Sequence, residues 1–163
     1  MEIIYYVAAS LDGFIATPAG GIDWLKPFEG TGEDYGYGEF YASIEAVLLG
    51  RATYEKSLQF PQWPFAGKAY WVCSHATGNT PASVVGEMKA RGLRRAWLVG
   101  GGKLAAAFRA EHLITEYIVS IVPVLLGAGI PLFDGAGPRD DLRLAHAKRY
   151  DSGIVQLRYE TVL

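Results

Sequence analysis

The sequence predicts a single α/β domain with a sheet of mixed strand direction, about eight strands by this count, and helices on its faces. Short apolar runs rich in β-branched and aromatic residues alternate with segments whose apolar side chains recur at helical spacing. Two of these runs end in glycine, and one leads directly into a helix-like segment. The final segment instead alternates apolar and polar residues, which is typical of a half-buried antiparallel strand.

The composition limits the class of protein. Of 163 residues, 50% are hydrophobic and 20% are charged, which is enough for one domain with a substantial core. The net charge of −2 without a basic stripe argues against binding to nucleic acid. The longest apolar stretch, residues 117–133, is interrupted by glycine and proline, so we expect no membrane span.

Cysteine, histidine and the first residues bear on location and metal binding. Cys73 is the only cysteine, so no intrachain disulfide can form, which suits a reducing compartment. The three histidines lack the spacing of metal ligands, so we expect no metal site. The chain starts without a basic segment or a cleavage site, and we therefore expect no signal peptide and a cytoplasmic location.

The first half of the chain contains three expected strands and two expected helices. Residues 3–9 are continuously apolar and predict a central strand buried on both faces, followed by a long loop over residues 10–30. A helical stripe follows, with Thr31 or Asp34 as the residue that caps its start. The stripe consists of Tyr37, Phe40, Tyr41 and Ile44. Residues 46–49 and 69–73 are expected strands, and Thr80-Pro81 predicts the start of a helix.

The second half continues the alternation and then changes. Residues 96–99 are an expected strand, residues 103–109 a helix, and residues 114–122 a further strand. Residues 142–150 are expected to pair with the alternating tail across a turn at residues 151–153, as an antiparallel hairpin.

Three glycines between the expected strand and helix are the strongest functional signal. Gly100, Gly101 and Gly102 let the backbone approach a ligand closely, and the helix that starts at Lys103 and Leu104 offers unpaired N–H groups and a positive dipole end. This pattern is typical of a phosphate site. A tight turn without a ligand is the alternative. The run fits a dinucleotide fingerprint, but it lies late in the chain and Ser120 stands where a Rossmann domain needs an acid.

A second group of candidates follows two other strands. Gly50 lets the backbone turn, the planar cation of Arg51 suits a phosphate monoester, and Thr53 offers a hydroxyl and an N–H to a diphosphate. Ser74 and His75, at the end of the next strand, are candidates for the other wall of the same pocket. An ordinary surface arginine and a solvated histidine are the alternatives.

The carboxylate candidates are Asp12 and Asp34. Ser10 and Asp12 leave the first strand at the edge where α/β sheets bind ligands, although Asp12-Gly13 also suits a simple turn. Asp34 begins the aromatic-striped helix, and the alternative to a catalytic role is that it caps this helix and does nothing more.

Four segments together resemble the dihydrofolate reductase superfamily, and especially the reductase domain of the bifunctional riboflavin-biosynthesis deaminase-reductase and its stand-alone relatives. They are SLDGFIA at residues 10–16, GRATYE at 50–55, VGGGKL at 99–104 and PVLLGAGIPLF at 123–133. The resemblance implies a three-layer α/β/α fold with a mostly parallel eight-stranded sheet, an antiparallel final pair and NADPH as hydride donor.

The resemblance also implies roles for the candidates. Arg51 would contact the adenosine 2′-phosphate, with Ser74 and His75 nearby. Thr53 and the backbone of residues 101–104 would hold the diphosphate, and the loop at residues 10–16 would border the nicotinamide. Ser10, Trp24 and Tyr37 are candidates to contact the substrate, although Tyr37 also suits the core. Asp12 and Asp34 are candidates to relay a proton.

We therefore expect an NADPH-dependent reductase that acts on a C=N or C=O bond of a pterin-, pyrimidine- or riboflavin-precursor-like small molecule. The chain lacks the zinc motif of the deaminase, and Ala105 replaces the tyrosine that commonly follows the glycines in dihydrofolate reductases. A nucleotide-binding module without turnover, or an enzyme that binds another phosphate ligand at the glycine turn, is the alternative. Surplus apolar residues in the stretch 117–133 and in the hairpin lead us to expect a homodimer.

Overall fold

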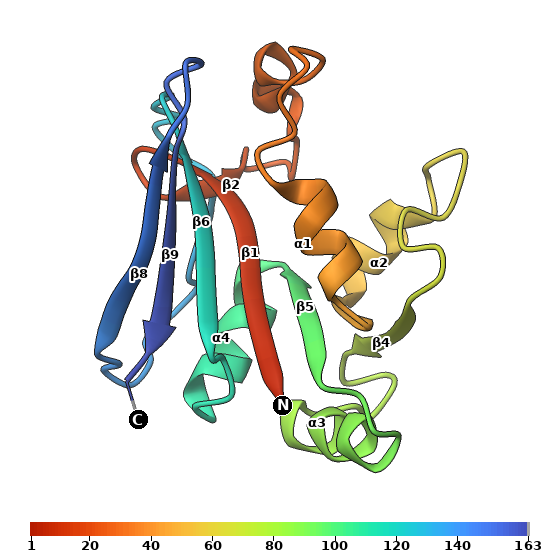
Figure 1. Cartoon of the computed structure of the whole chain (residues 1–163). Helices are drawn as coiled ribbons and strands as arrows, with labels where there is room; N and C mark the ends of the chain where they lie inside the picture. The colour runs from red at the N-terminus through yellow and green to blue at the C-terminus, as the bar shows by residue number, and fades with distance from the viewer. Residues whose placement is uncertain (163) are drawn as a thin grey trace.

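The computed structural model describes residues 1–162, which form three layers, a sheet with helices on both faces (Figure 1). The strands are β1 (Glu2–Ser10), β2 (Phe14–Ala16), β3 (Ala46–Gly50), β4 (Ala69–Cys73), β5 (Arg95–Gly100), β6 (Glu116–Val122), β7 (Ile130–Pro131), β8 (Leu142–Arg149) and β9 (Val155–Thr161). The helices are the 3-10 helix η1 (Asp23–Phe28), α1 (Tyr37–Ser43), α2 (Arg51–Ser57), α3 (Pro81–Ala90) and α4 (Gly102–Ala110).

The main sheet has seven strands in the order β4-β3-β5-β1-β6-β9-β8. The first five are parallel, β9 runs antiparallel to β6, and β8 runs antiparallel to β9. The predicted α/β fold with a mixed, mostly parallel sheet and a final hairpin is confirmed. The predicted count of eight strands is wrong, because β2 and β7 pair with each other in a separate two-stranded sheet.

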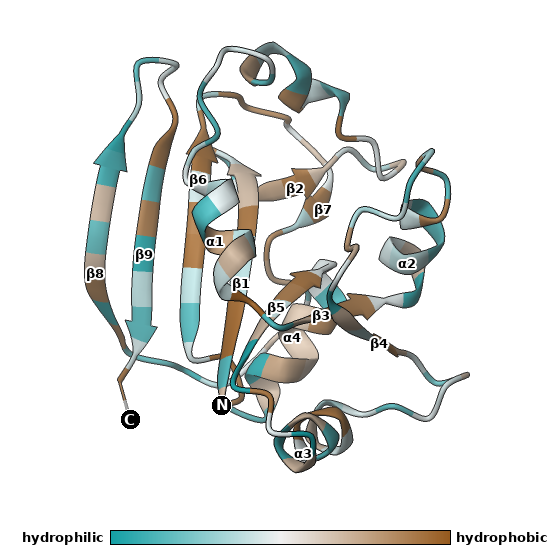
Figure 2. Ribbon diagram, turned by 45° about the vertical axis from the view of Figure 1, so that its right-hand side comes forward, coloured by the Kyte–Doolittle hydropathy of each residue, from teal (hydrophilic) through white to brown (hydrophobic). Residues whose placement is uncertain are grey.

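The sheet buries both of its faces. Successive side chains of a strand point to opposite faces, and neighbouring residues therefore belong to different core clusters. These pairs are Ile4 and Tyr5, Val47 and Leu48, and Trp97 and Leu98. One cluster includes α3 and α4 and the other includes α1, so the central strands are hydrophobic throughout (Figure 2). None of the helices in residues 1–162 has the length and hydropathy needed to cross a membrane.

The helix starts follow from local hydrogen bonds. At α3, the Thr80 side chain accepts from the Ser83 amide at 3.2 Å and Ser83 Oγ accepts from the Thr80 amide at 2.9 Å, so the predicted start at Thr80-Pro81 is confirmed. At α1, Asp34 accepts from the Gly36 and Gly38 amides at 2.9 and 3.1 Å. Of the two predicted caps, Asp34 therefore holds the start of α1, whereas Thr31 accepts from Glu33.

The expected loop at residues 10–30 is partly ordered into β2 and η1, which corrects that prediction. The Thr17 hydroxyl accepts a hydrogen bond from the Gly21 amide at 2.9 Å and closes a turn between β2 and η1. Lys56 of α2 donates to the Gly20 carbonyl, so the segment is also held from outside.

The C-terminal hairpin confirms the predicted pairing and the predicted half-buried last strand. All of β8 is exposed, whereas β9 is half-buried along its whole length. The polar side chains of β9 are used inside the fold: Arg158 Nε lies 2.7 Å from the buried Glu116 carboxylate, and Gln156 donates to Ser120 Oγ at 3.1 Å. The sequence pattern alone cannot distinguish such internal partners from water.

Much of the surplus apolar surface in the stretch 117–133 is buried within the chain. The Tyr5 hydroxyl donates to the Leu132 carbonyl at 2.8 Å. The Phe133 ring packs edge-on against Tyr5 and Tyr117, with ring centroids 5.7 and 5.8 Å apart. Leu125 remains 71% exposed. The homodimer therefore stays a prediction, with less apolar surface behind it than the sequence indicated.

Two glycines allow close contacts between α4, β2 and β7. A Cβ at Gly102 would lie 2.5 Å from the Pro131 carbonyl oxygen, and a Cβ at Gly129 would lie 2.1 Å from the Ala16 carbonyl oxygen. Both contacts are with backbone atoms, which cannot move aside like a flexible side chain. The lack of a side chain at Gly102 therefore allows α4 to start against β7, and the lack of one at Gly129 allows the segment before β7 to approach β2.

We expect Gly102→Ala to lower the free energy of unfolding by about 1–3 kcal/mol, because the added methyl overpacks a backbone contact. Gly86 in α3 is the matched control, since a Cβ there meets nothing within 4 Å. Gly86→Ala should raise the free energy of unfolding by about 0.5–1 kcal/mol through helix propensity. Urea unfolding at pH 7 measures both, and equal effects of the two substitutions would contradict the packing explanation.

Candidate functional site

Three strands end next to each other at the carboxyl edge of the sheet. Gly50 pairs with Cys73 of β4, and Leu49 pairs with Gly100 of β5. A Cβ built on Gly50 would lie 3.4 Å from the Gly100 carbonyl oxygen and 3.7 Å from the Gly101 nitrogen. The turn after β3 and the glycine turn after β5 therefore lie directly beside each other, with no side chain between their backbones. The prediction that both turns form one phosphate pocket requires this arrangement.

The helix start after β5 has free donors. Gly101 is the N-cap of α4, and the Ala105 amide is the first to bond back to it, at 3.0 Å. The amides of residues 102–104 precede that bond and have no partner within the helix. Gly100 has a φ of 121°, a conformation that favours glycine, and the Gly100–Gly101 peptide bond is cis. Lys103 is exposed and the Leu104 side chain is buried, so Leu104 can offer a ligand only its backbone.

A cavity of about 430 Å³ lies between α2 and the end of β4. Its lining residues are Arg51, Tyr54, Glu55, Tyr70, Trp71, Val72, Ser74, Ala76, Thr77 and Asn79. The structure thus brings Arg51 and Ser74 to one cavity. Arg51 begins α2 rather than lying in a loop, and its Nε lies 3.0 Å from Glu55 Oε1, one helical turn later.

Sequence reasoning missed the aromatic wall of this cavity. The Tyr54 and Tyr70 rings lie nearly parallel, 16° apart in plane, with centroids 6.1 Å apart. Tyr70 is 48% exposed although it lies in a strand. The sequence offered only the presence of Tyr70 in the apolar run 69–73, because its exposure, which suits stacking on a planar ligand, is a property of the tertiary structure.

The opposite wall is a polar turn after β4. The Thr77 side chain accepts from the Ser74 amide at 3.2 Å, and Asn79 Nδ2 donates to the Val72 carbonyl at 2.9 Å. Ser74, Thr77 and Asn79 line the cavity and make this wall polar, and these bonds occupy part of their hydrogen-bonding capacity. His75 is exposed and does not line the cavity.

Asp12 connects two loops at the end of β1. Its Oδ1 accepts from Ser10 Oγ at 2.5 Å and from the Leu126 amide at 3.1 Å, and its Oδ2 accepts from the Gly127 amide at 2.8 Å. These bonds, the one from Ser10 first, hold the pKa of the Asp12 carboxyl below its ordinary value. Ser10 is fully buried. Asp12 thus has a structural task, and its role in proton transfer stays a prediction.

The predicted substrate residues belong to different parts of the site. Tyr37 is the first residue of α1, 39% exposed, and its ring packs against Tyr41 and Trp97. Trp24 packs instead against the cluster of Val122 and Tyr150, with its indole N–H buried and without a partner among the described residues. Tyr37 and Trp24 therefore belong to different clusters and do not face each other across one pocket.

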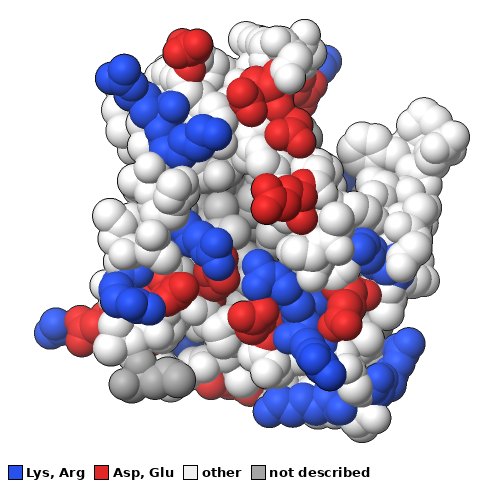
Figure 3. Space-filling view, viewed as in Figure 1, with Lys and Arg blue, Asp and Glu red and all other residues white. Residues whose placement is uncertain are grey.

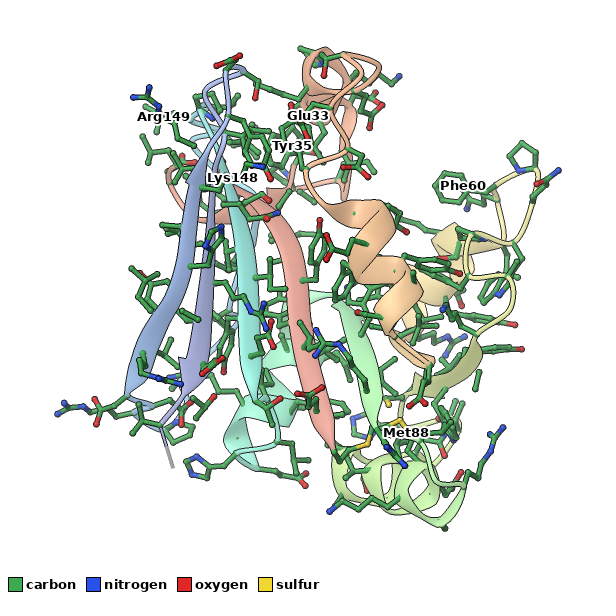
Figure 4. All side chains as sticks on the ribbon, in the orientation of Figure 1. Glu33, Tyr35, Phe60, Met88, Lys148 and Arg149 are labelled. Atoms are coloured by element: carbon green, nitrogen blue, oxygen red, sulfur yellow. The ribbon has the colours of Figure 1, made fainter. Side chains whose placement is uncertain are left out.

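Asp34 lies at the start of α1, near the C-terminal hairpin. The Gly36 and Gly38 amides hold the pKa of its carboxyl below the ordinary value. Tyr35, the next residue, donates from its hydroxyl to Ser152 Oγ at 3.1 Å, and its carbonyl accepts from Gln156 at 3.1 Å. Figure 4 shows Tyr35 beside Lys148 at the upper end of the hairpin, so the loop before α1 is bound to that end of the sheet.

A second cavity, of about 350 Å³, lies over β1, β6 and β9. Its lining residues are Tyr6, Gly36, Glu39, Phe40, Ser43, Arg95, Ile118, His146, Lys148, Tyr150, Gln156 and Arg158. The Tyr6 and Phe40 rings stack there at 4.2 Å and 10°. Basic side chains gather on the hairpin side of this hollow, and acidic ones above α1 and the loop before it (Figure 3).

Comparisons with known proteins agree with this architecture. A family model described as the RibD C-terminal domain matches residues 55–156. YwjB of Bacillus subtilis (strain 168), an uncharacterized protein, is 37% identical over 97% of both chains, and the uncharacterized YyaP of the same strain is 28% identical over 97% of this chain and 94% of that protein. A Shewanella sp. PV-4 protein named for riboflavin biosynthesis is 25% identical, with a TM-score of 0.89 over 100% of both chains.

We expect Asp12→Asn to destabilise the protein at pH 7, because an amide cannot accept hydrogen bonds at both side-chain atoms. A carboxyl whose pKa is lowered by folding stabilises the fold above its unfolded pKa of about 3.9, and this stabilisation is lost as the pH falls through the lower folded value. The difference in urea midpoint between wild type and Asp12→Asn should therefore be largest at neutral pH and shrink as the pH falls below the unfolded pKa of about 3.9.

Asp23→Asn is the matched control for that measurement. Asp23 is an exposed aspartate that forms an ion pair with Lys26, at 3.2 Å. It should change the midpoint little at any pH, because exposed ion pairs contribute little to stability. A pH-independent deficit in Asp12→Asn would mean that the charge of Asp12 is not what holds the two loops.

Proposed function

The chain belongs to the RibD C-terminal domain family and is reductase-like, and on that premise we propose that it is an NADPH-dependent reductase of a small ring-bearing substrate. The observation that carries the proposal is the backbone contact between the turns after β3 and β5, beside a cavity that contains Arg51. Hydride would pass to the carbon of a C=N or C=O bond in a pterin-, pyrimidine- or riboflavin-precursor-like molecule.

The residues present fit such a cofactor. Arg51 and Ser74 line a cavity with the size and stacking surface for an adenosine carrying a 2′-phosphate. The first amides of α4, with Thr53 at the start of α2, supply donors for a diphosphate. His75 is exposed next to Ser74 in the chain, and its contact with the cofactor stays a prediction.

The strand order supports a position for the substrate. The phosphate-binding turns follow β4, β3 and β5, and β1 is the next strand in the sheet. The nicotinamide would therefore lie at the end of β1, beside the loop at residues 10–16. The next hollow in the same direction is the cavity over β1, β6 and β9. We assign the substrate to this cavity, which Ser10, Trp24 and Tyr37 do not line, so their contacts with the substrate stay predictions.

The bound NADPH would supply the hydride, and the chain would orient the substrate and exclude water. Tyr6 and Phe40 offer an aromatic surface for a planar ring. Asp12 and Asp34 remain the proposed proton relays, acting through water, because each carboxylate is bound to backbone amides at the same time.

One observation favours a second candidate function, a nucleotide-binding module without turnover. Both candidate carboxylates are engaged by backbone amides, and folding lowers the pKa of each. A group held in the ionised form is a weak proton donor at neutral pH. Steady oxidation of NADPH with any pterin, ribosylamino-pyrimidine or imine substrate would exclude this alternative.

We expect Arg51→Ala to weaken NADPH binding by about 1.5–3 kcal/mol, the contribution of a charge-assisted hydrogen bond, and to leave NADH binding unchanged. Arg139→Ala is the matched control, because Arg139 is likewise exposed and paired with a nearby carboxylate, Asp141, at 2.9 Å. Isothermal titration calorimetry measures both. Unchanged NADPH affinity in Arg51→Ala would remove the phosphate assignment, and absence of NADPH binding to wild type would remove the proposed function.

A further inference from the structure

The proposed reaction still needs a group that gives up a proton. Hydride addition to the carbon of a C=N or C=O bond leaves negative charge on the nitrogen or oxygen, which must then be protonated. Asp12 and Asp34 can relay a proton through water, but backbone amides lower the pKa of both carboxyls, so neither holds a proton at neutral pH. The donor is therefore to be sought among the other side chains of the cavity over β1, β6 and β9, which we call the substrate cavity.

Tyr6 is the proton-bearing side chain of the substrate cavity that belongs to β1. The pairing of β1 with β5 ends at Tyr5, whereas its pairing with β6 continues to the end of the strand. Tyr6 is therefore the first residue beyond the part of β1 that is paired with β5, on the side toward the proposed nicotinamide position. His146, Lys148 and Tyr150 lie on or directly after β8, three strands from β1. Their backbones are about 14 Å from that of β1, so their side chains would have to cross β9 and β6 to reach the same atom.

The ring of Tyr6 is held in place while its hydroxyl keeps a proton to donate. The ring stacks on Phe40 with centroids 4.2 Å apart and meets the edge of Trp97 at 5.9 Å. The Trp97 indole N–H also donates to the Tyr6 carbonyl at 3.0 Å. The hydroxyls of Tyr5 and Tyr41 donate to backbone carbonyls at 2.8 and 2.9 Å. Within residues 1–162, no backbone carbonyl or carboxylate accepts in this way from the Tyr6 hydroxyl, so its proton is available to a ligand.

The surroundings of the Tyr6 hydroxyl suit an acid that stays protonated until the substrate needs it. Burial raises the pKa of Tyr6 to about 12, and a hydrogen bond from the Gln156 side chain opposes this rise. Tyr150, Tyr37 and Asp34 are the other groups that raise the pKa. A phenol of this kind is neutral at physiological pH, and the anion left by hydride addition is a stronger base than a phenolate, so it takes the proton. The Gln156 bond then stabilises the phenolate.

We propose that the Tyr6 hydroxyl is the catalytic acid of this reductase, which donates its proton to the substrate nitrogen or oxygen as hydride from NADPH reaches the carbon. The inference rests on the proposed function, because it concerns the same substrate cavity. The hydride forms the new C–H bond and leaves NADP⁺. The π electrons of the C=N or C=O bond form the new N–H or O–H bond, and the O–H bond of Tyr6 breaks. The phenolate then regains a proton from water.

The test compares Tyr6→Phe with wild type, since this change removes the hydroxyl and keeps the ring. NADPH oxidation is followed with dihydrofolate, 5-amino-6-ribosylaminouracil and 2-methyl-1-pyrroline as probes. For any probe that is reduced, Tyr6→Phe should lower kcat about 10²-fold or more, while KM and the calorimetric Kd of NADPH change less than about twofold. Between about pH 7.5 and 9.5, above the range where His146 titrates, the kcat of wild type should stay level. The residual kcat of Tyr6→Phe should fall with rising pH, because its protons then come from the solvent.

Tyr41→Phe is the matched control, because it also removes one tyrosine hydroxyl, and Tyr41 lines neither cavity. It should leave kcat and its pH dependence unchanged. Circular dichroism verifies that each variant is folded. A kcat of Tyr6→Phe within about threefold of wild type, or the same pH dependence in both proteins, overturns the role of Tyr6 alone. If wild type binds no NADPH in calorimetry, or reduces none of the three probes, the proposed function is wrong and this inference with it.

Discussion

The site depends on the close approach of backbone atoms at the ends of β3 and β5. Gly50 lies against the Gly100 carbonyl and the Gly101 nitrogen, and no side chain separates the two turns. Parallel strands place all their carboxyl ends at one edge of a sheet, so the turns that follow them meet there. The same edge is held from the other side, where Gly102 packs on the Pro131 carbonyl of β7. The start of α4 is therefore positioned by two close backbone approaches as well as by the packing of Leu104 and Ala105 in the core.

The carboxylates of this edge divide into structural and ligand-facing groups. Asp12 and Asp34 are tied to amides of neighbouring turns, and those bonds lower the pKa of each. Such bonds order the loops around the end of β1 and the start of α1, which border the proposed substrate cavity. Glu55 differs from both, because it pairs with the side chain of Arg51, at 3.0 Å, rather than with backbone amides.

Burial keeps the tyrosine and cysteine side chains of the core un-ionised at neutral pH. Tyr5 and Tyr117 are buried, and burial raises the pKa of Tyr117 to about 12, so it stays neutral at physiological pH. Cys73 is also buried, and its raised pKa, to about 11, leaves little reactive thiolate. The exposed polar groups of the two cavities suit recognition of a ligand by hydrogen bonds and stacking. Phe60, which projects from the loop after α2 (Figure 4), lies away from both cavities.

The sequence by itself determined the alternation of elements, the central position of β1, the glycine turn before α4, the Thr80-Pro81 helix start and the final hairpin. These follow from local periodicity and from backbone rules for glycine and proline, which act over a few residues. Only the tertiary structure decided that β2 and β7 leave the main sheet, that Arg51 and Ser74 share a cavity with Glu55, and that the polar residues of β9 face Glu116 and Ser120. These outcomes depend on partners far apart in the chain, because strand register and charge pairing between distant segments leave no periodic signal in the sequence.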